Sequence, residues 1–196
     1  MTAKDKSDGL VFRLARRLSC RNARFDVYLD DIRLASGETV HDYLVIEPRV
    51  RTHASVTGVA VLPIMDGRAG LLRIYRHPMQ EFSWELPRGF VDAGESDSLS
   101  AVRELEEETG LLCSERDLRS LGYLAPEPGI LAARVHLFVA LCSIPGGSFS
   151  ADEIGHQDFR FFSMDEIASL VADGLVQDPC TLVSYYRYRD LCGLNK

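Results

Sequence analysis

The chain of 196 residues has room for one full domain and an additional segment, and its 46% hydrophobic and 26% charged residues are typical of a globular protein. Its longest apolar runs, such as residues 135–141, are too short to cross a bilayer. The net charge of −7 argues against sequence-independent nucleic-acid binding, which depends on neutralising phosphates. Five cysteines without a C-x-x-C pair favour free thiols in a reducing compartment, so we expect a cytoplasmic protein without membrane or nucleic-acid partners.

The charge is unevenly distributed along the chain. Residues 1–24 contain seven Lys or Arg and two Asp, so the remaining residues carry a net charge of −12. Residues 10–18 are rich in Arg and are compatible with a short amphipathic helix, including one in a transit peptide. The early acidic residues favour a flexible or partner-packed terminal arm instead. No apolar core of a secretory signal follows the basic residues.

The segment after this basic stretch alternates between apolar and polar residues. The alternation predicts strands at 25–34 and 41–46, with a turn at 35–38. We therefore expect a small antiparallel β unit that ends near residue 48. The predicted domains are residues 1–50, an N-terminal arm and β-rich segment, and residues 51–196.

The second region predicts an α/β (α+β) domain in which helices pack against a sheet. Residues 56–64 and 70–75 form a buried hairpin around a turn at 65–68. A helix is expected at about 97–108, capped by Ser96 or Ser98 and ended by Gly110. The other expected elements are strands at 120–124, 133–142 and 158–162, a loop at 144–155, and helices at 164–173 and 178–191.

The helix at 97–108 carries an unusual cluster of acidic residues. Glu104, Glu107 and Glu108 are three and four positions apart and share one helix face, where each like-charged pair is destabilising by roughly 0.2–0.5 kcal/mol. They also lie in the C-terminal half, where the helix dipole disfavours anions. A solvated acidic face is one interpretation. A bound Mg²⁺ or Mn²⁺ ion, which prefers oxygen ligands, is the other.

A glycine-containing loop precedes this helix. Gly89 and Gly94 allow the backbone to approach a ligand closely and lead the chain to the helix start. Residues 89–111 fit G-x5-E-x7-R-E-U-x-E-E-x-G-U at every fixed position, where U is aliphatic. This segment resembles the Nudix box, and the resemblance favours the metal site over the solvated face.

The resemblance implies a Nudix α/β/α sandwich with a mixed sheet, and metal-dependent hydrolysis of a nucleoside diphosphate linked to another group. The metal ions would stabilise charge and position a water for attack on phosphorus. Arg103 would pair with a carboxylate and orient it, and Glu106 would face solvent. The resemblance assigns as metal ligands Glu104 and Glu108 first, Glu107 directly or through water, Glu95 as an occasional or outer ligand, and the backbone carbonyl of Arg88.

Features outside the box resemble the ADP-ribose pyrophosphatase subgroup. Pro126 follows Leu111 by fifteen residues in a Pro-x-Pro-Gly setting, and residues 73–76 and 84–87 match the same subgroup. A β-rich N-terminal segment is a further similarity, and it implies a homodimer in which this segment is exchanged. The implied reaction is cleavage of ADP-ribose to AMP and ribose 5-phosphate. Arg88 departs from the pattern, because many of these enzymes have a small residue there.

Several side chains around the box are candidates for contacts with the nucleotide. Arg76 is a phosphate or ribose contact or a surface ion pair, and Arg88 is a phosphate contact or a solvated turn residue. Trp84 stacks on adenine or anchors the core, and Phe82 is a further stacking candidate. Glu85 and Pro126 complete the expected substrate-binding set.

The catalytic base is expected in the acidic loop at 148–158. Glu153 is the first candidate and Asp152 the alternative, because a carboxylate must reach the attacking water. Either is equally compatible with a solvated loop. His156 is a further candidate, although a lone loop histidine is more often exposed.

Other functions remain open at this level. Another ADP-containing compound, a dinucleoside polyphosphate or a nucleotide sugar would suit the same box. A nucleotide-binding module without catalysis belongs to a different class, and such modules usually carry a degraded box, whereas this one is intact.

Overall fold

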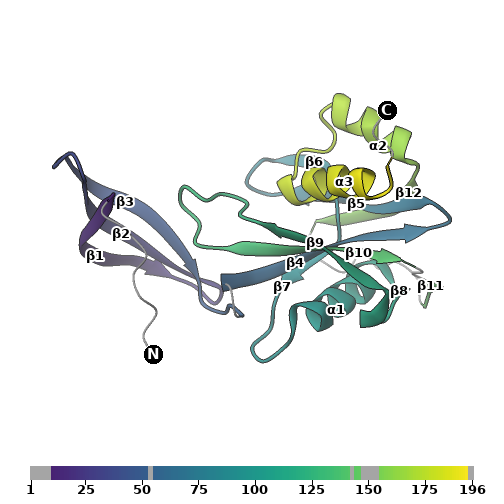
Figure 1. The fold of residues 1–196 in the computed structure, drawn as a ribbon, viewed down its shortest axis with the longest axis horizontal. Helices are drawn as coiled ribbons and strands as arrows, with labels where there is room; N and C mark the ends of the chain where they lie inside the picture. The colour runs from purple at the N-terminus through teal and green to yellow at the C-terminus, as the bar shows by residue number, and fades with distance from the viewer. Residues whose placement is uncertain (1–9, 53–54, 142–143, 147–154, 194–196) are drawn as a thin grey trace. The chain divides into compact units, whose positions relative to one another are not determined.

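A computed structural model describes residues 10–52, 55–141, 144–146 and 155–193 (Figure 1). The chain forms two compact units. The first contains Met1–Val50 and Glu127–Ala133, and the second contains Arg51–Pro126 and Arg134–Lys196. None of the helices within the described residues is both long and apolar enough to span a lipid bilayer.

The first unit is a three-stranded antiparallel sheet in the order β1 (Val11–Arg21), β2 (Phe25–Leu34) and β3 (Thr39–Pro48). The interpretation of residues 10–18 as a helix is therefore wrong, because β1 occupies this stretch. Pairing with β2 along the whole length of β1, with Arg16 opposite Asp30, overrides the local helical spacing.

Acidic residues of β2 and β3 balance the basic residues of β1. Arg16 makes a two-pronged hydrogen bond to Asp30, with both distances 2.7 Å. Arg21 pairs in the same way with Asp26 at 2.6 and 2.8 Å. Within the described residues, Arg16, Arg17 and Arg21 thus form ion pairs with acidic residues of their own sheet.

Replacing Arg16 with Met is expected to lower the free energy of unfolding by about 3–5 kcal/mol, the range for breaking a buried ion pair. The reason is that Asp30 is only 4% exposed and would keep a buried charge without its guanidinium partner. Urea denaturation of the full chain would measure the loss.

The matched control is Arg17→Met. Arg17 pairs with Asp42 at 2.6 Å, but both side chains are more than half exposed. Exposed pairs contribute about 0–1 kcal/mol. Equal losses in the two variants would contradict the assignment of Arg16 as the buried partner.

The second unit is built on a seven-stranded mixed sheet. Its main path runs β12-β5-β4-β10-β9, while β6 pairs with β5 and β7 pairs with β4. Only β10 and β4 are parallel; the other described pairs in this sheet are antiparallel. The strands are β4 (Val56–Met65), β5 (Arg68–Arg76), β6 (Glu81–Glu85), β7 (Arg88–Phe90), β9 (Leu118–Leu124), β10 (Arg134–Leu141) and β12 (His156–Phe162).

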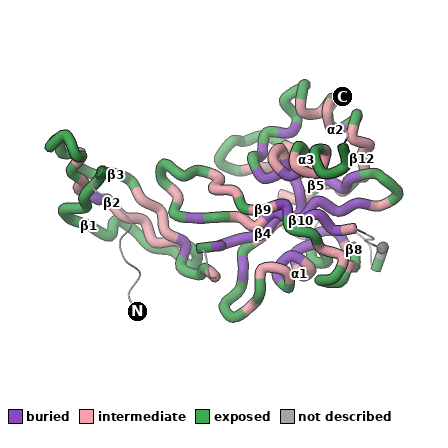
Figure 2. Tube along the Cα trace, in the orientation of Figure 1, coloured by how far each residue is buried: buried purple, intermediate pink, exposed green. Residues whose placement is uncertain are grey.

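Helices cover both faces of this sheet, which makes the unit an α/β/α sandwich, as predicted (Figure 1). Helix α1 (Asp97–Thr109) lies on one face, and α2 (Met164–Ala172) and α3 (Pro179–Leu191) lie on the other. Buried β4 side chains alternate between the two cores: Ala60 and Leu62 pack toward α2 and α3, and Val59 and Val61 toward α1. The central strand β4 is accordingly the most continuously buried strand of the unit (Figure 2).

The ends of α1 follow the local sequence signals. Ser96 is the N-cap, and its hydroxyl accepts a hydrogen bond from the Leu99 N–H at 3.1 Å. Gly110 ends the helix with a φ of +70°, a conformation that favours glycine. The helix that carries the acidic cluster therefore has the predicted boundaries to within one residue.

The segment predicted as a loop at 144–155 contains a short element. Strand β11 (Ile144–Pro145) pairs with β8 (Leu111–Leu112), which directly follows α1. A 3-10 turn at Glu115–Asp117 then leads to β9. Cys20, Cys113, Cys180 and Cys192 are free thiols, as expected, and Cys142 lies outside the described residues.

Candidate active site

The pairing of β7 with β4 brings the box glycine against helix α1. Gly89 lies opposite Val59 in this pairing. A Cβ atom at Gly89 would lie 2.1 Å from the carboxyl carbon of Glu104, so the Glu104 side chain occupies space that only a glycine leaves free. Glu108, one turn later, accepts a hydrogen bond at Oε2 from the Arg88 backbone N–H at 2.8 Å. The loop and the helix thus fix both carboxylates.

Arg103 connects the other acids of the box. Its guanidinium donates to Glu104 at 2.8 Å, to Glu107 at 3.0 Å and to Glu95 at 3.2 Å. A hydrogen bond from the Ser100 hydroxyl, together with the Arg103 contact, lowers the pKa of Glu95 below its ordinary value. Glu95 therefore stays ionised at neutral pH, and Arg103 sets the orientation of three carboxylates.

The residues of this region suit a hard divalent cation. Glu104 and Glu108 are 8% and 4% exposed, and carboxylates this buried require compensation of their charge. Among the described residues, no group of three or more His, Cys, Asp or Glu side chains forms a ready-made cage. Mg²⁺ is commonly held by one or two carboxylates, with water and substrate phosphates completing its shell. Glu106 and Glu107 are exposed, and Glu107 turns toward Arg103.

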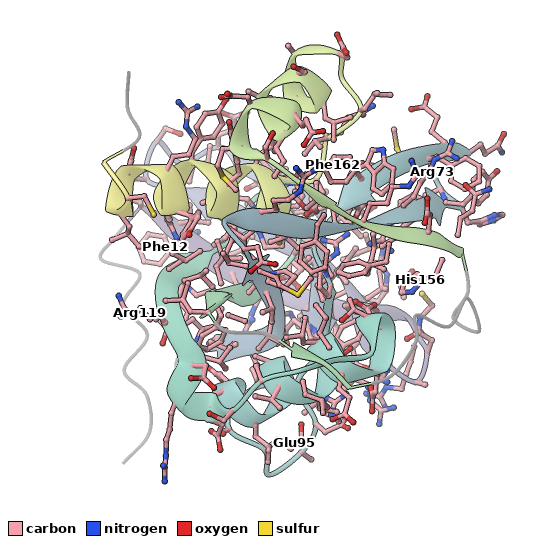
Figure 3. All side chains as sticks on the ribbon, turned by 90° about the vertical axis from the view of Figure 1, so that its right-hand side faces the viewer. Phe12, Arg73, Glu95, Arg119, His156 and Phe162 are labelled. Carbon is pink, nitrogen blue, oxygen red and sulfur yellow. The ribbon has the colours of Figure 1, made fainter. Side chains whose placement is uncertain are left out.

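His156 is not the exposed loop residue that was expected. It is the first residue of β12 (Figure 3). Its side chain is 4% exposed. Its Nε2 atom lies 3.4 Å from Oε1 of Glu108. The histidine therefore borders the carboxylates of the box, which sequence reasoning did not predict.

A network of two arginines and two acids lies at the start of β7. Arg76 donates to both carboxylate oxygens of Glu85, at 3.0 and 3.1 Å through Nε. Arg88 donates to Glu85 at 2.8 Å and to Asp178 at 2.7 Å. Glu85 and Asp178 are buried, whereas the Arg76 side chain is 36% exposed. Both arginines thus form ion pairs, and Arg88 is not a solvated turn residue.

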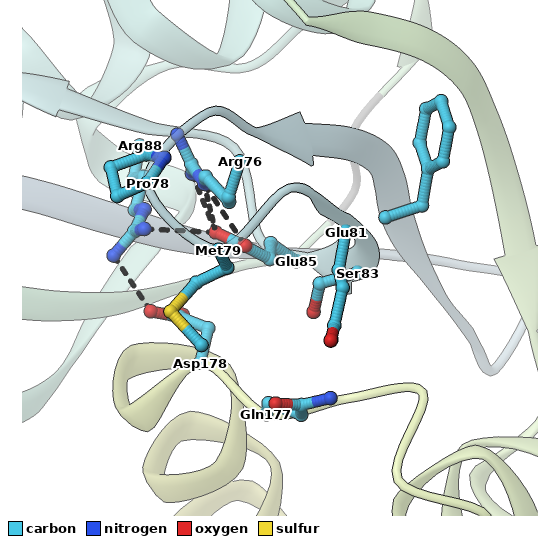
Figure 4. A pocket seen from close by; sticks show the side chains of 10 residues that line it. Arg76, Pro78, Met79, Glu81, Ser83, Glu85, Arg88, Gln177 and Asp178 are labelled. Carbon is cyan, nitrogen blue, oxygen red and sulfur yellow. Dashed lines mark hydrogen bonds and ion pairs between the residues drawn. The ribbon is translucent and has the colours of Figure 1, made fainter.

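These side chains border a cavity of about 330 Å³ (Figure 4). Asp178 is the N-cap of α3, and Thr181 donates to it through its backbone N–H and its hydroxyl, both at 2.8 Å. Asp178 was not among the predicted site residues; its only signal in the sequence is an Asp before a Pro at a helix start. The remaining lining residues are Pro78, Met79, Glu81, Phe82, Ser83 and Gln177.

The other predicted residues lie elsewhere. Trp84 packs edge-to-face on Phe162, with ring centroids 4.8 Å apart, beside the core under α2 and α3. Trp84 was expected either to stack on adenine or to anchor the core, and the structure shows it in contact with the core. Pro126 is half-buried after β9 and does not line the cavity. Glu153 and Asp152 lie outside the described residues.

Burial raises the pKa of both Cys113 and Cys180 to about 11. Because of this raised pKa, their thiolate fraction at pH 8 should be about 100-fold below that of an ordinary free thiol. The thiolate is the form that reacts with maleimide. Maleimide labelling at pH 8, followed residue by residue by peptide mass spectrometry, should therefore be slow at these two sites. The exposed Cys20 and Cys192 are the internal comparison. Labelling of Cys180 as fast as Cys20 would contradict this prediction.

Comparisons with known proteins agree with this arrangement. A model of the NUDIX domain matches residues 54–180. A CMP-5'-(N-acetyl-N-hydroxy-3-aminopropyl)phosphonate hydrolase of Streptomyces rubellomurinus is 33% identical over 151 residues, which is 76% of this chain and 67% of that protein. An ADP-ribose pyrophosphatase of Bacillus subtilis is 31% identical over 116 residues, 59% of this chain and 57% of that one.

A solved structure shows the fold. It is that of an ADP compounds hydrolase, which matches with a TM-score of 0.77 at 21% identity over 95% of this chain and 96% of that chain. The family model covers well over half of the sequence and includes the box, the buried glutamates and the arginine network. The chain therefore belongs to the Nudix hydrolase family.

Proposed function

We propose that this protein is a Mg²⁺- or Mn²⁺-dependent pyrophosphohydrolase that cleaves ADP-ribose to AMP and ribose 5-phosphate. The observation that carries the proposal is the pair of buried glutamates, Glu104 and Glu108, held against Gly89 and Arg88. The similarity to an ADP-ribose pyrophosphatase supports the choice of substrate. The free thiols support our proposal of a cytoplasmic location.

We propose the following roles for the chain's residues, and their contacts support them. Glu104 and Glu108 would hold the cation, with Glu107, Glu95 and the Arg88 carbonyl as additional ligands in our proposal. The bound cation would neutralise the diphosphate and favour ionisation of the attacking water. Arg103 keeps the carboxylates oriented through its hydrogen bonds to Glu104, Glu107 and Glu95.

The cavity beside Arg76 is the proposed place for part of the substrate. Arg76 is the more exposed of the two arginines, and its guanidinium can donate to a phosphate or ribose oxygen while Glu85 fixes its plane. Arg88, bound by Glu85 and Asp178, sets the cavity wall. Trp84 and Pro126 do not line this cavity. In our proposal they therefore support the residues around the cavity and do not contact the substrate there.

Glu153 is the proposed general base, with Asp152 as the alternative. Glu153→Gln should lower the turnover number with little change in the affinity for metal, and Asp152→Asn should leave both unchanged. Lower turnover in Asp152→Asn, with unchanged turnover in Glu153→Gln, would identify Asp152 as the general base in place of Glu153.

A second candidate function is hydrolysis of a cytidine nucleotide joined to a phosphonate. The similarity to the Streptomyces enzyme, which extends over 76% of this chain, favours it. A dinucleoside polyphosphate or a nucleotide sugar would also suit the box. The intact box argues against a binding module that lacks catalysis.

A product assay tests these alternatives. The full chain with Mg²⁺ or Mn²⁺ would be incubated with ADP-ribose, NADH, diadenosine triphosphate, GDP-mannose, ADP-glucose and a CMP-linked phosphonate. We expect AMP and ribose 5-phosphate from ADP-ribose at the highest kcat/KM. Preferential release of CMP would favour the second candidate, and no turnover of any compound would favour the binding module.

We also propose a homodimer built by residues 1–50. Strand β1 is exposed along nearly its whole length, and Leu10, Phe12, Leu14 and Leu18 are between 45% and 74% exposed. Burial of such side chains against a second copy would be favourable. Light scattering should give a dimer for the full chain and a monomer for residues 51–196. A truncated chain that remains dimeric would refute this role.

A further inference from the structure

The position of His156 is fixed by the sheet. Gly155 has a φ of +90°, and a Cβ there would lie 2.6 Å from the Tyr75 carbonyl oxygen. The Tyr75 N–H donates to the Gly155 carbonyl at 2.8 Å, and His156 pairs with Ile74 of β5. A glycine is therefore required just before the histidine, and it places His156 in register with the central part of the second unit.

The imidazole faces one oxygen of Glu108. The carboxylate is held from the other side, because Oε2 accepts from the Arg88 N–H at 2.8 Å. This leaves Oε1 directed toward Nε2 of His156, at a distance of 3.4 Å. The two side chains are only 4% and 5% exposed. Two groups that commonly bind metals thus face each other in a region shielded from water.

The 3.4 Å separation of Nε2 and Oε1 is longer than an ordinary N–H···O hydrogen bond, which spans about 2.7–3.2 Å. Two ligands of one cation, each bonded at about 2.1 Å, lie about 3.0 Å apart in octahedral and about 3.4 Å apart in tetrahedral geometry. The observed spacing equals the tetrahedral value and exceeds the octahedral one by about 0.4 Å, so a small movement of either side chain brings the nitrogen and the oxygen to one octahedral ion.

We propose that Nε2 of His156 is a ligand of the divalent cation that Glu108 binds, and that it makes the site prefer Mn²⁺ and other transition-metal ions to Mg²⁺. The inference rests on the metal requirement in the proposed function and narrows it. Imidazole nitrogen suits transition metals, whereas Mg²⁺ prefers all-oxygen shells and gives up water reluctantly. The family motif alone supplies only oxygen ligands, so this preference comes from a residue outside the box.

Pulsed electron paramagnetic resonance of the full chain loaded with Mn²⁺, without substrate, tests the inference. We expect electron spin-echo modulation from a directly bound imidazole ¹⁴N, replaced by the ¹⁵N pattern when histidine alone is ¹⁵N-labelled. His156→Gln should abolish the signal. His136→Gln is the matched control, because His136 bonds Asp97 and Ser120 instead, at 2.9 and 2.7 Å, and its replacement should leave the signal intact.

A second measurement is the ratio of Mn²⁺ to Mg²⁺ affinities, obtained by competition at equilibrium. We expect His156→Gln to lower this ratio by about 10-fold or more, because changes in the groups around a bound metal typically alter its affinity by about 10–100-fold. Wild-type protein with bound Mn²⁺ but no histidine-dependent modulation would overturn the proposal, and the isotope experiment decides this even if the variant fails to fold.

The two proposals fail in different ways. A chain that cleaves ADP-ribose with Mn²⁺ but shows no histidine coupling would overturn the nitrogen ligand and leave the proposed function standing. A chain that shows the coupling but cleaves none of the compounds would support the ligand and overturn the proposed function.

Discussion

Replacing Glu108 with Gln should lower the turnover number by about 10³-fold or more while the fold persists, because a metal ligand that stabilises transition-state charge contributes several kcal/mol. The amide has nearly the same shape, and its oxygen can still accept from the Arg88 N–H. What is lost is the negative charge that would bind the cation. Steady-state kinetics of ADP-ribose cleavage and circular dichroism melting would measure the two effects.

The control is Glu106→Gln on the same helix. Glu106 is exposed, and it occupies the variable position of the box. Its replacement removes the same charge from α1 without touching the buried pair, so turnover should stay within about twofold, as is usual for surface changes. A folded Glu108→Gln protein that cleaved substrate at the parental rate would show that the metal assignment is wrong.

Gly89→Ala is expected to damage both stability and activity. The new methyl group would lie 2.1 Å from the carboxyl carbon of Glu104, so either the side chain or strand β7 must move. Overpacking of this kind typically lowers the free energy of unfolding by about 1–3 kcal/mol. Displacement of a metal-binding carboxylate by about 1 Å should lower turnover by about 100-fold.

Gly94→Ala separates steric crowding from backbone strain. Gly94 has a φ of +90°, but no atom lies within 4 Å of the position that a Cβ would take there. Its replacement should lower the free energy of unfolding by about 1–2 kcal/mol, because of the left-handed backbone alone, and leave Glu104 in place. Urea denaturation and kinetics on both variants would measure the difference. Parental turnover in Gly89→Ala would mean that the close packing of Glu104 is not required.

Local signals account for the parts of the fold that could be predicted. Ser96 and Gly110 mark the ends of α1, and the alternation along β2 and β3 marks those strands. The helix prediction for residues 10–18 failed because their spacing suits a helix, whereas the pairing of Arg16 with Asp30 on another strand determines their structure. Propensity is a weak guide when long-range pairing competes with it.

In the candidate site, too, the local spacing of residues could be predicted from the sequence and the long-range contacts could not. The box predicts that Glu104 and Glu108 share a helix face, since three- and four-residue spacing is local information. It contains nothing about Asp178, which reaches Arg88 across 90 residues of sequence, or about the approach of His156 to Glu108. Those contacts depend on the order of β12, β5 and β4 in the sheet and on the direction in which α3 starts.

Arg88 contacts both the proposed cation site and the cavity, each through different atoms. Its backbone N–H holds Glu108, and its guanidinium holds Glu85 and Asp178 at the cavity. A ligand that shifts this side chain would therefore change the free energy of cation binding, and thermodynamic linkage requires the reverse effect to be equal. Titrations of Mn²⁺ at increasing nucleotide concentration should thus show cooperativity between two ligands, transmitted through one residue.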